Sequence, residues 1–207
     1  MSVKVLGIST SPRIKGNSDL LLREAIAGAS AAGAEVEYLP VREMNIAGCQ
    51  ACNSCWEEGI CRIQDDFQSV FAKFLEVDHL IVATPIHFMS VCGQAKLLID
   101  RCQCLWARKY VLNQPLFPDA QRDRWAMVIA VGATSSTNMF DCVRLTMKYW
   151  LDALERNCAA NLFVNQVDEC GAILAHPSAM REASRLGRQL ATATDSDLAA
   201  LEDVELF

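Results

Sequence analysis

The fold is decided near the start of the chain by the stretch VKVLGISTSPRIKGNSDLLLREAIAGASAAG, residues 3–33. Residues 3–8 are apolar enough for a buried strand, and residues 9–18 form a polar loop that contains a glycine. Apolar residues then recur at helical spacing over residues 19–32, and Gly33 ends that pattern. A strand, a polar loop and an amphipathic helix in this order predict the first unit of a parallel α/β sheet.

Strand-like and helix-like segments alternate through the rest of the chain. Further strands are expected at residues 36–39, 79–83, 125–131 and 159–164, and further helices at residues 65–76, 91–101, 138–156 and 177–193. This alternation predicts a doubly wound, five-stranded parallel sheet with helices on both faces. The sheet forms a single domain over residues 1–207, with a cysteine-rich loop at 44–65, an insertion at 103–123 and a C-terminal tail at 194–207.

Composition excludes some partners. The 207 residues are 52% hydrophobic, which suits one domain with a full core, and the formal net charge is −6. Basic and acidic residues are mixed and form no basic stripe, so we expect no nucleic-acid partner. The sequence has no apolar run of membrane-spanning length and no signal-peptide pattern, so we expect a cytoplasmic protein with no membrane partner.

Residues 9–18 offer a set of hydrogen-bond donors suited to a phosphate group. The loop leads into a helix N-terminus, which favours anions, and Gly16 permits a backbone shape that other residues resist. The same composition also suits a strand-to-helix turn capped by Asn or Ser, so composition alone leaves both interpretations open. The residues expected to hold the phosphate are Ser9, Ser11, Arg13, Asn17 and Ser18, and Thr10 in the same loop is also expected to bind the cofactor.

Three segments of the chain resemble the NAD(P)H-dependent FMN reductase family. They are GISTSPR at 7–13 with GNS at 16–18, DHLIVATPIHF at 78–88, and AKLLIDR at 95–101. The resemblance implies FMN, with its phosphate on the first loop and its ring against residues 85–88. It also implies the flavodoxin-like strand order 2-1-3-4-5, in which ligands bind at the carboxyl ends of the strands. The further cofactor-binding residues expected on this basis are Pro85, Ile86, His87, Phe88, Gly132, Ala133 and Thr134.

His87 departs from the family pattern, because many relatives carry Tyr at this position. The imidazole could donate a proton to the reduced flavin, although a solvated loop histidine is the commoner case. His87 is the one catalytic candidate, and no catalytic residue is assigned with certainty.

The cysteine-rich loop carries Cys49, Cys52, Cys55 and Cys61, spaced Cys-x2-Cys-x2-Cys-x5-Cys. Four thiolates can hold zinc or an iron–sulfur cluster. Structural zinc usually pairs two Cys-x2-Cys knuckles separated by about 15–20 residues. The compact run here resembles ferredoxin-type loops instead, although no Pro follows Cys61.

The same spacing resembles the iron–sulfur flavoprotein subgroup, which implies a [4Fe–4S] cluster. Zinc, buried thiols and redox-active disulfides are the alternatives. The six remaining cysteines are expected to be small buried side chains: Cys92, Cys102, Cys104, Cys142, Cys158 and Cys170.

The combined patterns predict an FMN-dependent oxidoreductase. It would pass electrons between a reduced donor, FMN and a cysteine-bound cluster, with NAD(P)H or ferredoxin as donor and a small molecule or protein as acceptor. One alternative is an NAD(P)H-dependent FMN or quinone reductase without a cluster, and another is a flavin-binding module with structural zinc.

We also expect a homodimer or homotetramer, in which the cluster of one chain serves the flavin of another. The aromatic insertion and the acidic tail, with its apolar end, favour such contacts.

Overall fold

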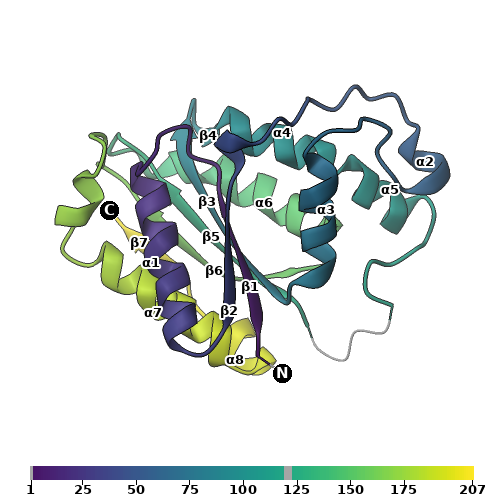
Figure 1. Cartoon of the computed structure of the whole chain (residues 1–207). Helices are drawn as coiled ribbons and strands as arrows, with labels where there is room; N and C mark the ends of the chain where they lie inside the picture. The colour runs from purple at the N-terminus through teal and green to yellow at the C-terminus, as the bar shows by residue number, and fades with distance from the viewer. Residues whose placement is uncertain (1, 119–122) are drawn as a thin grey trace.

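The computed structural model describes residues 2–118 and 123–207 and shows a central parallel sheet between two layers of helices (Figure 1). Its strands run in the order β2-β1-β3-β5-β6-β7, and β4 pairs antiparallel with β3. The strands are β1 (Lys4–Ser9), β2 (Glu35–Pro40), β3 (His79–His87), β4 (Ser90–Val91), β5 (Trp125–Val131), β6 (Asn157–Val164) and β7 (Val204–Leu206). The expected doubly wound parallel sheet is therefore confirmed, and β4 and β7 add two short strands to the five expected.

Helices cover both faces of the sheet because successive strand residues point to opposite sides. In β3, Leu80 and Val82 pack toward one helix layer, while Ile81 and Ala83 pack toward the other. The first layer contains α3 (Phe67–Glu76), α4 (Gly93–Arg101) and α6 (Asp141–Ala153), and the second contains α1 (Asn17–Ala31) and α7 (Ala179–Thr192) (Figure 1).

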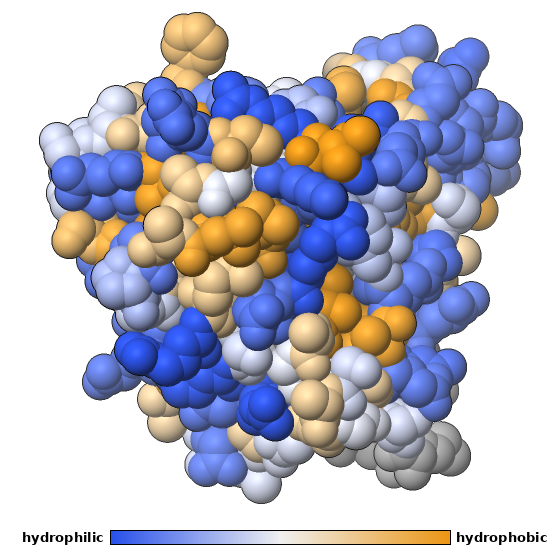
Figure 2. Space-filling model, turned by 60° about the vertical axis from the view of Figure 1, so that its left-hand side comes forward, coloured by the Kyte–Doolittle hydropathy of each residue, from blue (hydrophilic) through white to orange (hydrophobic). Residues whose placement is uncertain are grey.

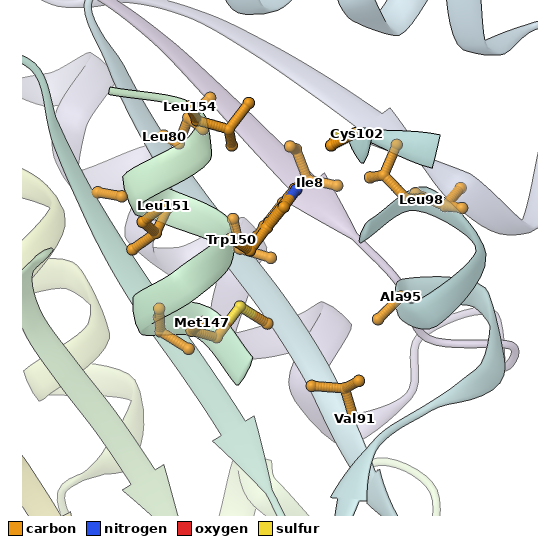
Figure 3. Packing of buried hydrophobic residues seen from close by; sticks show 14 of the residues in the cluster. Ile8, Leu80, Val91, Ala95, Leu98, Cys102, Met147, Trp150, Leu151 and Leu154 are labelled. Atoms are coloured by element: carbon orange, nitrogen blue, oxygen red, sulfur yellow. The ribbon is translucent and has the colours of Figure 1, made fainter. Parts of the chain in front are cut away.

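The first layer is filled by large apolar side chains. Trp150 of α6 lies toward Ile8 of β1, and Leu98 of α4 faces the same core from the other side (Figure 3). These side chains are almost completely buried, so this layer fixes α4 and α6 on the sheet.

The second layer relies on two glycines that let α1 and α7 touch through their backbones. A Cβ at Gly28 would lie 2.2 Å from the Ser184 carbonyl oxygen, and one at Gly187 would lie 1.9 Å from that of Ala25. This close contact holds α1, and with it the loop that precedes α1, firmly against the sheet. The face that carries these helices shows hydrophilic side chains with separate apolar patches between them (Figure 2).

Two segments contain structure that the sequence pattern does not predict. The insertion at 103–123 begins with α5 (Gln103–Tyr110), and residues 119–122 lie outside the described residues. The tail forms α8 (Asp195–Ala199) and then β7, which pairs in parallel with β6. The tail thus docks on its own chain and gives no evidence for a neighbouring one.

The remaining short elements lie in the connections: α2 (Cys55–Glu58), η1 (Val41–Glu43), η2 (Thr137–Phe140) and η3 (Ala172–Ala175). Within the described ranges, no helix is both long enough and apolar enough to cross a membrane.

Candidate functional site

A cavity of about 260 Å³ opens at the carboxyl ends of β1, β3 and β5. Its wall is formed by the C-terminal end of β3 and by the loops that follow β1, β5 and β6. Its lining consists of Ser11, Pro12, Arg13, Gly16, Asn17, Ser18, Pro85, Ile86, His87, Val131, Ala133, Val167 and Asp168. This is the edge of a doubly wound sheet where ligands are expected.

Eight of the residues expected to bind the cofactor line this cavity: Ser11, Arg13, Asn17, Ser18, Pro85, Ile86, His87 and Ala133. The other five lie elsewhere. Ser9 and Thr10 are buried behind the wall, where the Thr10 hydroxyl donates to the Ala83 carbonyl at 2.8 Å. Phe88 is fully exposed, the backbone of Gly132 packs against Met139, and the Thr134 carbonyl accepts from the Gln166 N–H.

One end of the cavity is suited to an anion. Gly16 precedes the first residue of α1, and a Cβ there would lie 2.5 Å from the Ser11 hydroxyl oxygen, so glycine leaves this concave turn open. The Ser18 hydroxyl is buried and has no hydrogen-bond partner among the described residues. An unpaired buried hydroxyl at a helix N-terminus fits the terminal phosphate of FMN, which would supply the missing acceptor.

The loop after β6 completes the wall, and the sequence analysis missed it. Asn17 donates from its side-chain nitrogen to the Glu169 carbonyl at 2.8 Å, and its side-chain oxygen accepts from the Ile173 N–H at 3.3 Å. Arg13 donates to the Asp168 carbonyl at 3.4 Å. These contacts bring Val167 and Asp168 to the cavity, where they face residues that lie about 150 positions earlier.

A buried acidic group supports the phosphate-binding loop from behind. One oxygen of Asp19 accepts from Ser9 at 2.6 Å and from Tyr38 at 2.5 Å, and the other accepts from Arg23 at 3.1 Å. Burial alone would raise the pKa of Asp19, but the hydrogen bonds from Ser9, Tyr38 and Arg23 outweigh it and lower that pKa. The carboxylate therefore stays charged and ties together β1, α1 and β2.

The strand that carries His87 turns back through a strained hairpin. Ile86 pairs with Val91 and His87 with Ser90, so Phe88 and Met89 form a two-residue turn. Both turn residues have positive φ, 49° and 62°, which is the conformation that Asn-Gly usually supplies. The strained turn lies directly beside the cavity, because His87 lines it.

A second, smaller cavity of about 30 Å³ is lined by all four cysteines of the loop and also by Arg101 and Cys104. Cys49 and Cys52 are exposed, whereas Cys55 and Cys61 are half-buried. Nowhere in the described chain are three or more His, Cys, Asp or Glu side chains arranged to hold a metal ion. The four thiols therefore line one cavity, but they are not arranged closely enough to hold a metal ion.

The local chemistry of this hollow is suited to thiolate ligation. None of the described residues that line it carries a carboxylate. Ala51 and Asn53, on either side of Cys52, adopt positive φ of 50° and 58°. Such left-handed residues wind a loop tightly and occur in the backbone nests of many iron–sulfur sites. The donor set fits an iron–sulfur cluster, provided that the sulfurs move together when it binds.

The thiols differ in their tendency to ionise. A hydrogen bond with Ser54 lowers the pKa of Cys52, whereas burial and the neighbouring thiols raise the pKa of Cys55. Burial, with further effects from Cys61 and Cys55, raises the pKa of Cys104 to about 12. Cys104 is therefore a neutral thiol in the wall of the hollow at neutral pH.

The expectation that the other six cysteines are buried is correct for Cys92, Cys102 and Cys104. It is wrong for Cys142, Cys158 and Cys170, which are exposed. Cys142 faces solvent on α6, Cys158 lies near the start of β6, and Cys170 lies in the loop after β6.

Residues 3–161 match the model of the NADPH-dependent FMN reductase family. The chain belongs to this family. The family prediction is thereby confirmed, and with it the expectation of a protein related to flavin-dependent oxidoreductases.

Curated relatives carry the name iron–sulfur flavoprotein. One from Methanocaldococcus jannaschii is 41% identical over 103 residues, which cover 50% of this chain and 53% of that protein. One from Archaeoglobus fulgidus is 34% identical over 128 residues, which cover 62% of this chain and 61% of that protein. The chain thus matches little more than half the length of these relatives.

Solved structures confirm the fold. An NAD(P)H:quinone oxidoreductase from Methanothermobacter marburgensis superposes with a TM-score of 0.71 at 17% identity, covering 93% of this chain and 98% of that one. A flavone reductase superposes with a TM-score of 0.69 at 21% identity, covering 97% and 66%. Both solved structures share the α/β architecture of this chain.

Proposed function

We propose that the chain is an FMN-dependent oxidoreductase that passes electrons between a reduced donor, FMN and a [4Fe–4S] cluster. The observation that best supports this proposal is that the chain contains two separate cavities, each lined by a different set of side chains. One lies at the carboxyl edge of the sheet beside a helix N-terminus, and the other is lined by four cysteines. The family match supports the flavin, and the names of the curated relatives support the cluster.

The flavin would bind along the first cavity. Ser11, Arg13, Asn17 and Ser18 would hold the phosphate, and their position around the N-terminus of α1 supports this role. Pro85, Ile86, His87 and Ala133 lie on the adjoining wall and would hold the ring. FMN would supply one- and two-electron redox chemistry, and these residues would bind and orient it.

The cluster would bind to Cys49, Cys52, Cys55 and Cys61. An iron–sulfur cluster supplies one-electron transfer, so the two groups together would connect two-electron and one-electron partners. Cys49 and Cys52 are exposed, so these two residues would be the ones to move toward the half-buried Cys55 and Cys61 when a cluster binds.

The family favours a nicotinamide donor, and NAD(P)H would have to reach the flavin from the open side of the first cavity. Ferredoxin is the alternative donor, and the acceptor is a small molecule or a protein.

We also propose a homodimer or homotetramer. Mass measurement in solution tests this assembly, and a monomer would contradict it.

A reductase without a cluster is the second candidate, because the four thiols are not yet gathered into a metal site. Anaerobic purification with an absorption spectrum, flavin and metal analysis, and an NADPH oxidation assay separate the candidates. Iron with sulfide and FMN supports the proposal, FMN without metal supports the simple reductase, and stoichiometric zinc supports a structural zinc site.

A further inference from the structure

Arg101 is a buried cation beside the cysteine loop. It is the last residue of α4, and only 1% of its surface is exposed. One terminal nitrogen donates to the Ala47 carbonyl at 3.0 Å and to the Asp65 carboxylate, and the other donates to the Ile63 carbonyl at 3.0 Å. The three oxygen acceptors compensate the two terminal nitrogens for their loss of water, while the buried Nε has no partner among the described residues.

These acceptors lie at the two ends of the cysteine loop. Ala47 comes before the first cysteine, while Ile63 and Asp65 come after the last. The Asp65 carboxylate also accepts from the Ala47 N–H at 2.9 Å and from the Phe67 N–H at 3.0 Å, which links the loop to α3. One guanidinium therefore holds the entry and the exit of the loop together against α4.

The same side chain faces the cysteines. Arg101 lines the hollow together with Cys61 and Cys104. The ion pair with Asp65 balances one charge, but four thiolates around iron would add further negative charge to this region. A fixed cation at this place would favour that charge.

We propose that Arg101 is a positioning residue that closes the cysteine loop before any metal binds and keeps a positive charge beside Cys61. Loop closure is independent of the metal, whereas the effect of the charge rests on the proposed function. Arginine suits both roles because its planar fork reaches the Ala47 and Ile63 carbonyls at once, which a lysine ammonium does not.

Hydrogen exchange on the metal-free full chain tests loop closure. Arg101→Gln and Arg101→Lys are compared with Lys96→Gln, which removes an exposed cation from the same helix. In both Arg101 variants, the amide hydrogens of residues 45–49 and 61–67 should exchange about tenfold faster or more. The reason is that both variants lack the guanidinium that binds the Ala47 and Ile63 carbonyls and the Asp65 carboxylate. FMN binding and exchange in β3 and β5 should stay unchanged, which shows that the fold is intact. Wild-type protection of the loop in both variants would overturn the proposal.

If Arg101→Gln does not bind FMN, the hydrogen exchange of Arg101→Lys alone tests loop closure, because lysine keeps the charge and most of the side-chain volume. In iron-loaded protein, Arg101→Gln should lower the cluster's reduction potential relative to Arg101→Lys, because a nearby cation favours the more negative reduced state. Equal potentials would overturn the role of the charge. Wild-type protein that takes up no iron would overturn the proposed function, and the exchange result would still decide loop closure.

Discussion

The Ser9 hydroxyl donates a 2.6 Å hydrogen bond to the Asp19 carboxylate, and neither side chain is exposed to solvent. Ser18, in the same loop region, is equally buried, yet its hydroxyl has no partner among the described residues. The two serines therefore have different roles. Ser9 supports the fold of the phosphate-binding loop, and Ser18 is available to a ligand.

Exchange of each serine for alanine should separate these roles. Ser9→Ala should lower the free energy of unfolding of the flavin-free chain by about 1.5–3 kcal/mol, since a hydrogen bond to a charged group is lost. Ser18→Ala should not lower that stability, because the buried Ser18 hydroxyl has no hydrogen bond to lose. It should instead weaken FMN binding about tenfold and riboflavin binding less, because riboflavin lacks the phosphate. Urea unfolding and flavin fluorescence titration measure both effects, and equal loss of FMN and riboflavin binding would contradict the phosphate assignment.

Asp19 should make stability depend on acid pH. Its pKa is lower in the folded chain than in the unfolded chain, so the folded chain binds fewer protons at this group. The stabilisation is fully present above the unfolded pKa of about 3.9 and is lost as the pH falls through the lower folded pKa. When the pH is lowered from neutral through the folded pKa of Asp19, the free energy of unfolding should therefore fall less in Asp19→Asn than in wild type. Identical slopes in urea unfolding at stepped pH would contradict this.

The hairpin beside the cavity should be more stable with a different turn. Phe88 and Met89 both have positive φ, and Phe88 is fully exposed. Replacing the pair with Asn-Gly should raise the free energy of unfolding by about 1 kcal/mol or more, because each bulky residue is strained there. Thermal or urea unfolding measures the gain. A loss of stability would show that one of these side chains is held by contacts that outweigh the strain.

Cysteine variants should distinguish ligands from wall residues. Cys52→Ala should abolish iron uptake while FMN binding remains, because the phosphate-binding loop belongs to a different cavity. Cys104→Ala is the matched control. Its thiol is buried and donates to the Arg101 carbonyl at 3.4 Å, so its loss should leave the iron content unchanged. Iron and flavin analysis after anaerobic reconstitution tests the pair, and iron retained by Cys52→Ala would contradict the ligand set.

The sequence predicts the sheet well because each central strand is a short apolar run between helical patterns. It misses β7, since three residues at an edge carry no periodic signal and pair only because the chain returns to β6. It also places Ser9 among the ligand contacts, because composition cannot tell which way a hydroxyl in a loop points.

Long-range contacts account for the other differences at the site. Val167 and Asp168 reach the cavity because Arg13 and Asn17 bind carbonyls of their loop, and the local sequence carries no sign of this. An arginine at a helix end is usually exposed to solvent, and only the folded loop shows that Arg101 is buried.

The most direct test of the account is the content of iron, acid-labile sulfide, zinc and flavin in protein purified and reconstituted without oxygen. We expect one FMN with about four iron and about four sulfide per chain, as a [4Fe–4S] cluster on four cysteines requires. Stoichiometric zinc without iron uptake, or flavin with no metal after reconstitution, would contradict it.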